Sequence, residues 1–298
     1  MPGLNLRTVL QNAKAARVAI GHFNFSEVVV LKAVATTARQ THVPVIMGVS
    51  EGEREFIGVR QAAALVKSFR DEHGQAIFLN ADHTHSLEKA LEAANAGFDM
   101  IVFDVSTLPF EENVRLTRET VEAVKSVNPE ILVEGEIGYI GASSSIHDAV
   151  PKDMSPLTTP EEAKQFVEAT GIDVLAPAVG TMHGLLKSMT TGQEHKHIDV
   201  ERIGEIAAAT GTFLTLHGGS GTGVADIVAG IRAGLTVIHI NTEIRLAWRR
   251  ALDDALAKDP DEVAPYHIFP EAYEAVSAVV KSRLESYSQG DRGSAAGV

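Results

Sequence analysis

Three histidines each follow a short apolar run of the chain, where the catalytic groups of parallel α/β proteins gather. His83, His183 and His217 come after the third, sixth and seventh of eight such runs. Three converging imidazoles leave one position free on a zinc ion, for a water or a substrate oxygen. Each histidine alone would more often cap a strand or bond a loop carbonyl. In a chain without cysteine, the three together predict a catalytic metal site.

Acidic side chains are expected beside these histidines. Asp82 precedes His83, Asp104 ends the fourth run, and Glu134 and Glu136 lie two residues apart in the fifth. Residues two apart in a strand point to one face, so both glutamates are expected in the interior, where they need a cation or donors. None of the 11 lysines falls inside an expected strand. This favours a metal as the compensating charge and removes the lysine nucleophile of a Schiff-base aldolase.

A glycine-rich segment, HGGSG at 217–221, precedes a helical segment that begins near Gly223. Glycines there let the backbone approach a phosphate at the N-terminus of a helix. Lys187, four residues after His183, could add a positive charge, although a solvent-exposed loop lysine is an equally good interpretation. The segment therefore favours a phosphorylated substrate.

The elements that must position these residues alternate along the chain. Strands are expected at 18–25, 44–49, 76–82, 99–105, 131–138, 173–180, 213–220 and 236–242. Segments between them repeat apolar residues three and four apart, as amphipathic helices do. Eight such units favour an α/β (β/α)8 TIM barrel over an open doubly wound sheet. We predict one domain over 1–288, with an extra helix at 271–288 and a disordered tail at 289–298.

Composition and charge narrow the class of partner. The 298 residues are 45% hydrophobic, and 26 Lys and Arg against 39 Asp and Glu give a formal charge of −13. Such a surface argues against nucleic-acid and membrane partners. We find no apolar stretch of signal-peptide or membrane-spanning length, and therefore expect a cytoplasmic protein. Two long connections, 139–158 and 181–197, are expected to act as lids or substrate loops.

Taken jointly, the motifs resemble those of the class II, metal-dependent ketose-bisphosphate aldolases, which include fructose-bisphosphate and tagatose-bisphosphate aldolases. The resemblance runs from about residue 5 to 285 and rests on NADH at 80–83, FDVSTLPFEEN at 103–113, VEGEIGYIG at 133–141, APAVGTMHG at 176–184, LHGGSG at 216–221 and INTEIR at 240–245. It implies zinc-dependent aldol cleavage of a ketose 1,6-bisphosphate. Fructose 1,6-bisphosphate, split into dihydroxyacetone phosphate and glyceraldehyde 3-phosphate, is the leading candidate.

The resemblance also implies a role for individual residues. His83, His183 and His217 would bind the zinc, Asp82 would be the catalytic acid/base, and Asp104 and Glu136 would belong to a neighbouring metal position. A second divalent metal and a monovalent cation fit the same pattern, as does a homodimer or homotetramer. The residues lining the substrate pocket would be Asn24, Ser50, Gly184, Lys187, Gly218, Gly219, Ser220, His239, Asn241 and Thr242.

Two places depart from the family pattern. Family members commonly carry a Glu in the loop after the fifth strand to return the last proton, where this chain has Ser144; His147 or Asp148 could substitute. In the eighth strand, family members usually have a Lys and two further polar residues where this chain reads VIHIN at 237–241. Both departures bear on the substrate more than on the metal.

Other functions stay open at this point. Tagatose bisphosphate differs from fructose bisphosphate only at C4, and a third phosphoketose is compatible with the departures. A metal-dependent hydrolase of this fold would place an H-x-H pair on the first strand, which offers only His22, while the pair His83–His85 follows the third strand. A non-catalytic sugar-phosphate-binding protein would not need Asp82 together with three histidines.

Overall fold

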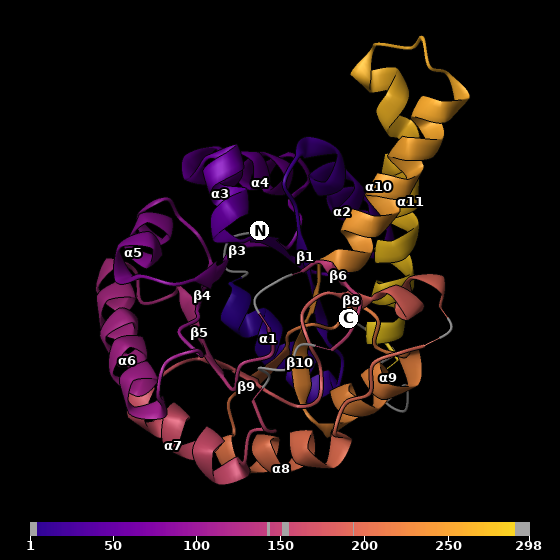
Figure 1. Cartoon of the computed structure of the whole chain (residues 1–298). Coiled ribbons are helices and arrows are strands. Elements are labelled where there is room, and N and C mark those ends of the chain that lie inside the picture. The colour runs from indigo at the N-terminus through magenta and orange to yellow at the C-terminus, as the bar shows by residue number, and fades with distance from the viewer. Residues whose placement is uncertain (1–4, 142–143, 151–154, 193, 290–298) are drawn as a thin grey trace.

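The computed structural model of the chain describes residues 5–141, 144–150, 155–192 and 194–289. Eight parallel strands close into a barrel, and helices surround it (Figure 1). The barrel strands are β1 (Ile20–Asn24), β2 (Val45–Val49), β3 (Ile77–Thr84), β4 (Met100–Phe103), β5 (Leu132–Ile137), β7 (Val174–Pro177), β9 (Phe213–Leu216) and β10 (Leu235–Ile240). The first and last strands pair in parallel, with Ile20 opposite Val237, which closes the ring. The predicted (β/α)8 barrel is therefore confirmed.

Amphipathic helices form the outer layer. They are α1 (Leu6–Ala16), α2 (Val28–Thr41), α3 (Glu51–Ile57), α4 (Val59–His73), α5 (Leu87–Asn95), α6 (Phe110–Val127), α7 (Pro160–Thr170), α8 (Val200–Thr210), α9 (Val224–Ala233), α10 (Thr242–Lys258) and α11 (Pro265–Tyr287). Local sequence sets several of their starts: the Ser86 side chain accepts from Lys89 N, and Thr159 and Glu162 cap α7 reciprocally. Most of these helices bury their apolar stripes against the strands.

One end of the barrel is filled by apolar side chains. Leu6, Val9 and Leu10 of α1 form a buried cluster with residues from the first half of the strands, among them Ile20 and Val237. Helix α1 therefore closes the N-terminal end, and chemistry has to occur at the carboxyl ends of the strands, as is usual in this fold.

The C-terminal helix is longer than the sequence pattern predicts. It begins at Pro265, a residue that suits the first turn of a helix, rather than near residue 271, and it continues through Pro270, which lies inside the helix. Helices α10 and α11 pack together as a hairpin that projects beyond the barrel (Figure 1). Of the tail predicted to be disordered, residues 290–298 lie outside the described residues.

The two long connections contact each other. Strands β6 (Ile146–His147) and β8 (Leu185–Leu186) pair in parallel, and a 3-10 helix, η1 (Lys187–Thr191), follows. The sequence analysis did not predict this small sheet. In the described part of the chain, we find no helix with the length and apolar character that a bilayer crossing requires.

Candidate active site

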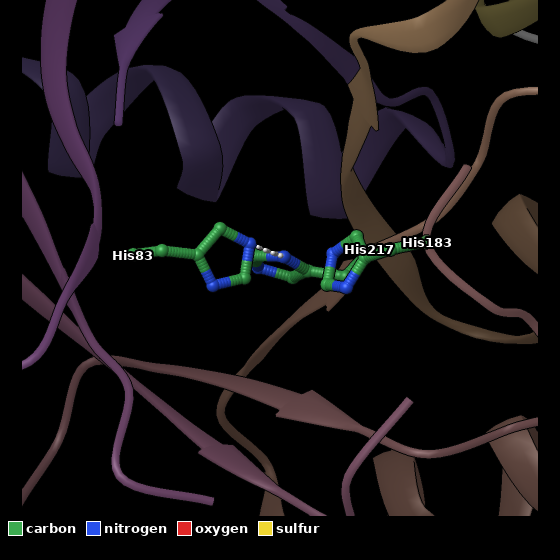
Figure 2. A group of neighbouring side chains, drawn as sticks. All are labelled: His83, His183 and His217. Carbon is green, nitrogen blue, oxygen red and sulfur yellow. Dashed lines mark hydrogen bonds between the residues drawn. The ribbon is translucent and has the colours of Figure 1, made fainter. Parts of the chain in front are cut away.

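The three predicted metal-binding histidines converge at the carboxyl end of the barrel (Figure 2). Their ring centroids are 4.7 Å apart for His83 and His183, 4.8 Å for His83 and His217, and 5.7 Å for His183 and His217. His217 directly follows β9, and His183 lies in the segment after β7. One nitrogen from each ring falls within 4.8 Å of the others, which is a separation that a single ion can span.

The local backbone at the end of β3 brings Asp82 and His83 to the same site. Adjacent residues of a regular strand point to opposite faces. Here the pairing with β4 shifts register between Ala81 and Thr84, and His83 has a φ of 41°, which is uncommon outside glycine. This irregularity turns both side chains toward the mouth of the barrel.

The second nitrogen of each imidazole is held by an oxygen of the protein. His83 Nδ1 lies 2.8 Å from Asp104 Oδ2, His183 Nδ1 lies 2.5 Å from the carbonyl of Gly141, and His217 Nε2 lies 2.5 Å from Glu134 Oε1. Each of these nitrogens therefore carries the proton and donates. The nitrogens left to bind an ion are His83 Nε2, His183 Nε2 and His217 Nδ1, the arrangement typical of metal-bound imidazoles.

Two buried glutamates lie beside the histidines, on the same face of β5 as the sequence predicts. Glu134 Oε2 accepts from Thr215 Oγ1 at 2.7 Å, and Glu136 Oε1 accepts from Ser106 Oγ at 3.3 Å. Burial raises the pKa of Glu134 to about 7. Burial, reinforced by the charge of Asp104, raises the pKa of Glu136 well above its usual range.

The charges of the site centre on His83. Burial opposes protonation, but the carboxylates of Asp82, Asp104 and Glu136 outweigh it and raise the pKa of His83 to about 10. Burial and the positive charge of His83 lower the pKa of His217 to about 3. The same two causes lower the pKa of His183 well below its ordinary value. The site thus holds one positive charge among several carboxylates, with two neutral imidazoles ready to act as ligands.

These residues fit a divalent metal ion. Glu136 Oε2 and His239 Nε2 are buried side-chain atoms with no hydrogen-bond partner among the described residues. Orphaned buried polar atoms are costly unless an ion or water satisfies them. Imidazole nitrogens with carboxylates as neighbours suit zinc and other first-row transition metals. A second group that could hold an ion comprises His83, Asp104 and Glu136, which is the neighbouring metal position implied by the resemblance.

Asp82 is held in place through Asn24 and Glu53. Asn24 Nδ2 lies 2.9 Å from Asp82 Oδ2 and 2.9 Å from Glu53 Oε2. Glu53 in turn accepts from the backbone of Ser50 at 2.8 Å and from Arg245 at 2.6 Å. Although burial acts to raise it, the charges of His83 and His239 hold the pKa of Asp82 well below its usual range. The site thus contains an ionised carboxylate with a fixed orientation.

His239 stacks on a histidine that sequence reasoning did not include in the site. The ring centroids of His22 and His239 are 3.5 Å apart and the two ring planes are nearly parallel, and His22 Nε2 lies 2.9 Å from Asn80 Nδ2. His239 Nδ1 lies 3.4 Å from Asp82 Oδ1. His22 and Asn24 are two residues apart in β1 and so point to one face, and the parallel register of β1 with β10 sets His22 opposite His239.

Most of the predicted substrate residues line one cavity. Together with Asp82, Ser144, His83, His183 and His217, this cavity is lined by Asn24, Gly184, Gly218, Ser220, His239, Asn241 and Thr242. Ser50 lines an adjoining cavity of about 330 Å³, which Ser144 also reaches. Gly219 packs against the carbonyl of His239 instead. Lys187 is exposed and pairs with Asp148 at 2.6 Å, outside the lining of both cavities.

The HGGSG loop and the N-terminus of α10 lie together at the cavity. Ser220 Oγ accepts from the N–H groups of Asn241 and Glu243 at 3.3 and 3.4 Å, which places the HGGSG loop against the N-terminus of α10. The partial positive charge of a helix N-terminus and the glycine backbone suit a phosphate group. This is the usual phosphate position of the fold, after the last two barrel strands.

The closed barrel and the cluster of histidines and carboxylates at its mouth are those expected of a metal-dependent barrel enzyme. The family model described as "Fructose-bisphosphate aldolase class-II" matches residues 4–292, and the chain belongs to this family.

The curated relatives and solved structures agree with this assignment. A protein of Bacillus subtilis (strain 168) named "Probable fructose-bisphosphate aldolase" is 32% identical over 295 residues, which cover 98% of this chain and 100% of that protein. A "Fructose-bisphosphate aldolase" of Staphylococcus aureus (strain N315) is 33% identical over 297 residues, covering 98% and 99%. The crystal structure of the YdjI aldolase from Escherichia coli K12 has a TM-score of 0.80 at 26% identity and covers 97% of this chain and 99% of its own.

Proposed function

We propose that the chain is a zinc-dependent aldolase that cleaves fructose 1,6-bisphosphate reversibly into dihydroxyacetone phosphate and glyceraldehyde 3-phosphate. The observation that carries this proposal is the convergence of His83, His183 and His217 beside the oriented carboxylate of Asp82. The relatives named for this activity support it over the full length of the chain. They do not favour the tagatose-bisphosphate, hydrolase or non-catalytic alternatives.

His83, His183 and His217 would hold the zinc, with Asp104 and Glu136 as the carboxylates of a second divalent position. When bound, the metal supplies Lewis-acid stabilisation of the negative charge that develops on the substrate oxygens as C3–C4 breaks. Glu134, Asp104 and the carbonyl of Gly141 fix the orientation of the three imidazoles before the metal arrives.

Asp82 is the acid/base in this proposal. Asn24 donates to its Oδ2 atom, whereas Oδ1 is buried and has no hydrogen-bond partner among the described residues, so Oδ1 would accept the proton of the C4 hydroxyl during cleavage. The same carboxyl returns this proton in condensation. The low pKa of Asp82, set by His83 and His239 against the effect of burial, keeps it in the form that accepts a proton.

The proton returned to C3 needs a separate donor. Ser144 lines the cavity, but a serine hydroxyl is a poor acid. Asp148 is 84% exposed and engaged by Lys187. His147 lies closer, because a Cβ at the cavity residue Gly184 would meet its Nε2 at 2.5 Å. We therefore expect His147→Ala to slow the C3 exchange of dihydroxyacetone phosphate with solvent, while Asp148→Asn leaves that exchange near the wild-type rate.

Three broader expectations belong to the same proposal. Residues 1–288 would act as one domain, in the cytoplasm, as a homodimer or homotetramer. The hairpin of α10 and α11 supports an assembly of copies, because its tip exposes Val263 (86%) and Tyr266 (74%) beyond the barrel.

The test is a substrate comparison. Purified protein would be incubated with fructose 1,6-bisphosphate or tagatose 1,6-bisphosphate, and dihydroxyacetone phosphate would be followed through a coupled reductase. The proposal expects turnover of the fructose isomer at a kcat/KM well above that of the tagatose isomer. Equal or reversed preference would contradict the substrate assignment. Turnover of neither sugar by zinc-loaded protein would contradict the proposed activity.

A further inference from the structure

A buried lysine that the mechanism does not use lies behind the metal site. Lys196, in the segment before α8, is only 4% exposed. Its ammonium donates to three backbone carbonyls, those of Met182, Gly184 and Gly218, at 2.6, 2.6 and 2.9 Å. Among the described residues, its hydrogen-bond partners are all carbonyl oxygens and include no carboxylate. A cage of backbone carbonyls around a dehydrated positive charge is also the donor set that proteins offer to potassium.

The three carbonyls belong to the two loops that carry metal ligands. Met182 and Gly184 flank His183, and Gly218 follows His217. These loops meet backbone to backbone: a Cβ at Gly218, where φ is 62°, would lie 2.4 Å from the carbonyl oxygen of Met182. Carbonyl dipoles gathered this closely repel one another unless a cation lies between them. Lys196 therefore supplies the charge that lets the two loops approach.

The geometry requires the protonated amine. Burial lowers the pKa of Lys196 to about 7, and the carboxylate of Glu243 acts in the opposite direction. Three carbonyl acceptors at hydrogen-bond distance match three N–H hydrogens, which the ammonium has and the neutral amine lacks. The backbone of Lys196 is also held in place, since its N–H group donates to the carbonyl of Gly221 at 2.9 Å.

We propose that the Lys196 ammonium is an internal cation that holds the His183 and His217 loops in register and fills the place of a monovalent ion. Lys196 is thus a positioning residue, acting on the metal site through the backbone of its ligands. Two consequences follow. The wild-type protein needs no potassium, and removing the side chain leaves a carbonyl cage that potassium or ammonium can enter.

The test measures zinc affinity, by competition with a chromophoric chelator, in potassium chloride and in N-methylglucamine chloride of equal ionic strength. For Lys196→Ala in N-methylglucamine, we expect zinc binding about 10- to 100-fold weaker than wild type, the usual loss when groups that orient metal ligands are removed. Potassium or ammonium should restore it along a saturating curve. Lys196→Met should stay weak in both salts, because its apolar side chain still occupies the cage.

Lys14 provides the matched control. Its ammonium also donates to two backbone carbonyls, those of Gly211 and Thr212 at 2.7 and 2.9 Å, but at the opposite end of the barrel. Lys14→Ala should bind zinc like the wild type in either salt. Circular dichroism and the thermal midpoint of each variant would establish that it is folded before its zinc affinity is compared.

Three results would overturn the proposal. The first is that potassium increases the zinc affinity of the wild-type protein along a saturating curve. The second is that folded Lys196→Ala binds zinc as tightly as the wild type without potassium. The third is that potassium fails to restore the zinc affinity of folded Lys196→Ala. The first uses the wild-type protein and so does not depend on the variant folding. The inference rests on the proposed function only for its consequence on turnover. If zinc binding behaves as expected but no ketose bisphosphate is cleaved, the proposed activity fails while the role of Lys196 stands.

Discussion

Replacing Glu134 with glutamine should weaken zinc binding although Glu134 is not expected to touch the metal. Its Oε1 atom accepts from His217 Nε2 at 2.5 Å, and its Oε2 atom accepts from Thr215 at 2.7 Å. Both His217 and Glu134 are almost fully buried, so solvent does not screen the interaction. The amide keeps the shape of the side chain but removes the charge that fixes the imidazole and raises its basicity.

The expected loss follows from that contact. Removing a carboxylate that orients a metal-bound histidine weakens metal affinity about 10- to 100-fold, or about 1.4 to 2.7 kcal/mol. The assay is chelator competition for zinc at about pH 8, because burial raises the pKa of Glu134 to about 7 and the wild-type group must be ionised. Glu168→Gln on the exposed face of α7 is the control. A Glu134→Gln variant that binds zinc within twofold of wild type would refute the role assigned to this carboxylate.

Two further substitutions test other parts of the site. Asn24→Ala removes the donor to Asp82 Oδ2, a hydrogen bond to a charged group that is worth about 1.5 to 3 kcal/mol. We therefore expect kcat to fall about 10- to 100-fold while the zinc content stays unchanged. A rise in KM alone would contradict the positioning role of Asn24. Gly218→Ala combines a left-handed backbone with a contact of 2.4 Å to the Met182 carbonyl, and should cost about 2 to 4 kcal/mol in chemical unfolding. Gly204→Ala, in the open on α8, should instead stabilise by about 0.5 to 1 kcal/mol; equal effects of the two changes would contradict the packing described here.

The barrel could be predicted from sequence because its signal is local. Each strand is a short apolar run buried on both faces, and all eight predicted runs overlap a barrel strand. The ends of the strands were predicted less well. The strand predicted at 213–220 extends past Leu216, where β9 ends, because the glycine-rich loop that follows also contains buried residues. Strands β6 and β8 have two residues each and pair across a separation of about forty residues, so no periodicity marks them.

The candidate site likewise contains residues that local sequence predicts and residues that only the tertiary structure reveals. Residues that end a strand and can do chemistry, such as Asp82 and His217, are predicted at the barrel mouth from their position alone, and both line the cavity there. Glu53 was missed because its spacing from Ser50 indicates a helix start, whereas its contacts with Asn24 and Arg245 arise from packing between distant segments. Lys196 lies in a polar loop that predicts a solvated lysine. Only the tertiary structure shows that three carbonyls surround it.

The central claim is that the three histidines hold the metal on which aldol cleavage depends. The most direct test strips the protein with a chelator and then titrates zinc back, with bound zinc and fructose 1,6-bisphosphate cleavage measured on the same samples. We expect turnover to be lost when the zinc is removed and to rise in proportion to bound zinc until the site is full. We expect no turnover in His183→Ala at the same total zinc. Full turnover in stripped protein, or in His183→Ala, would contradict it.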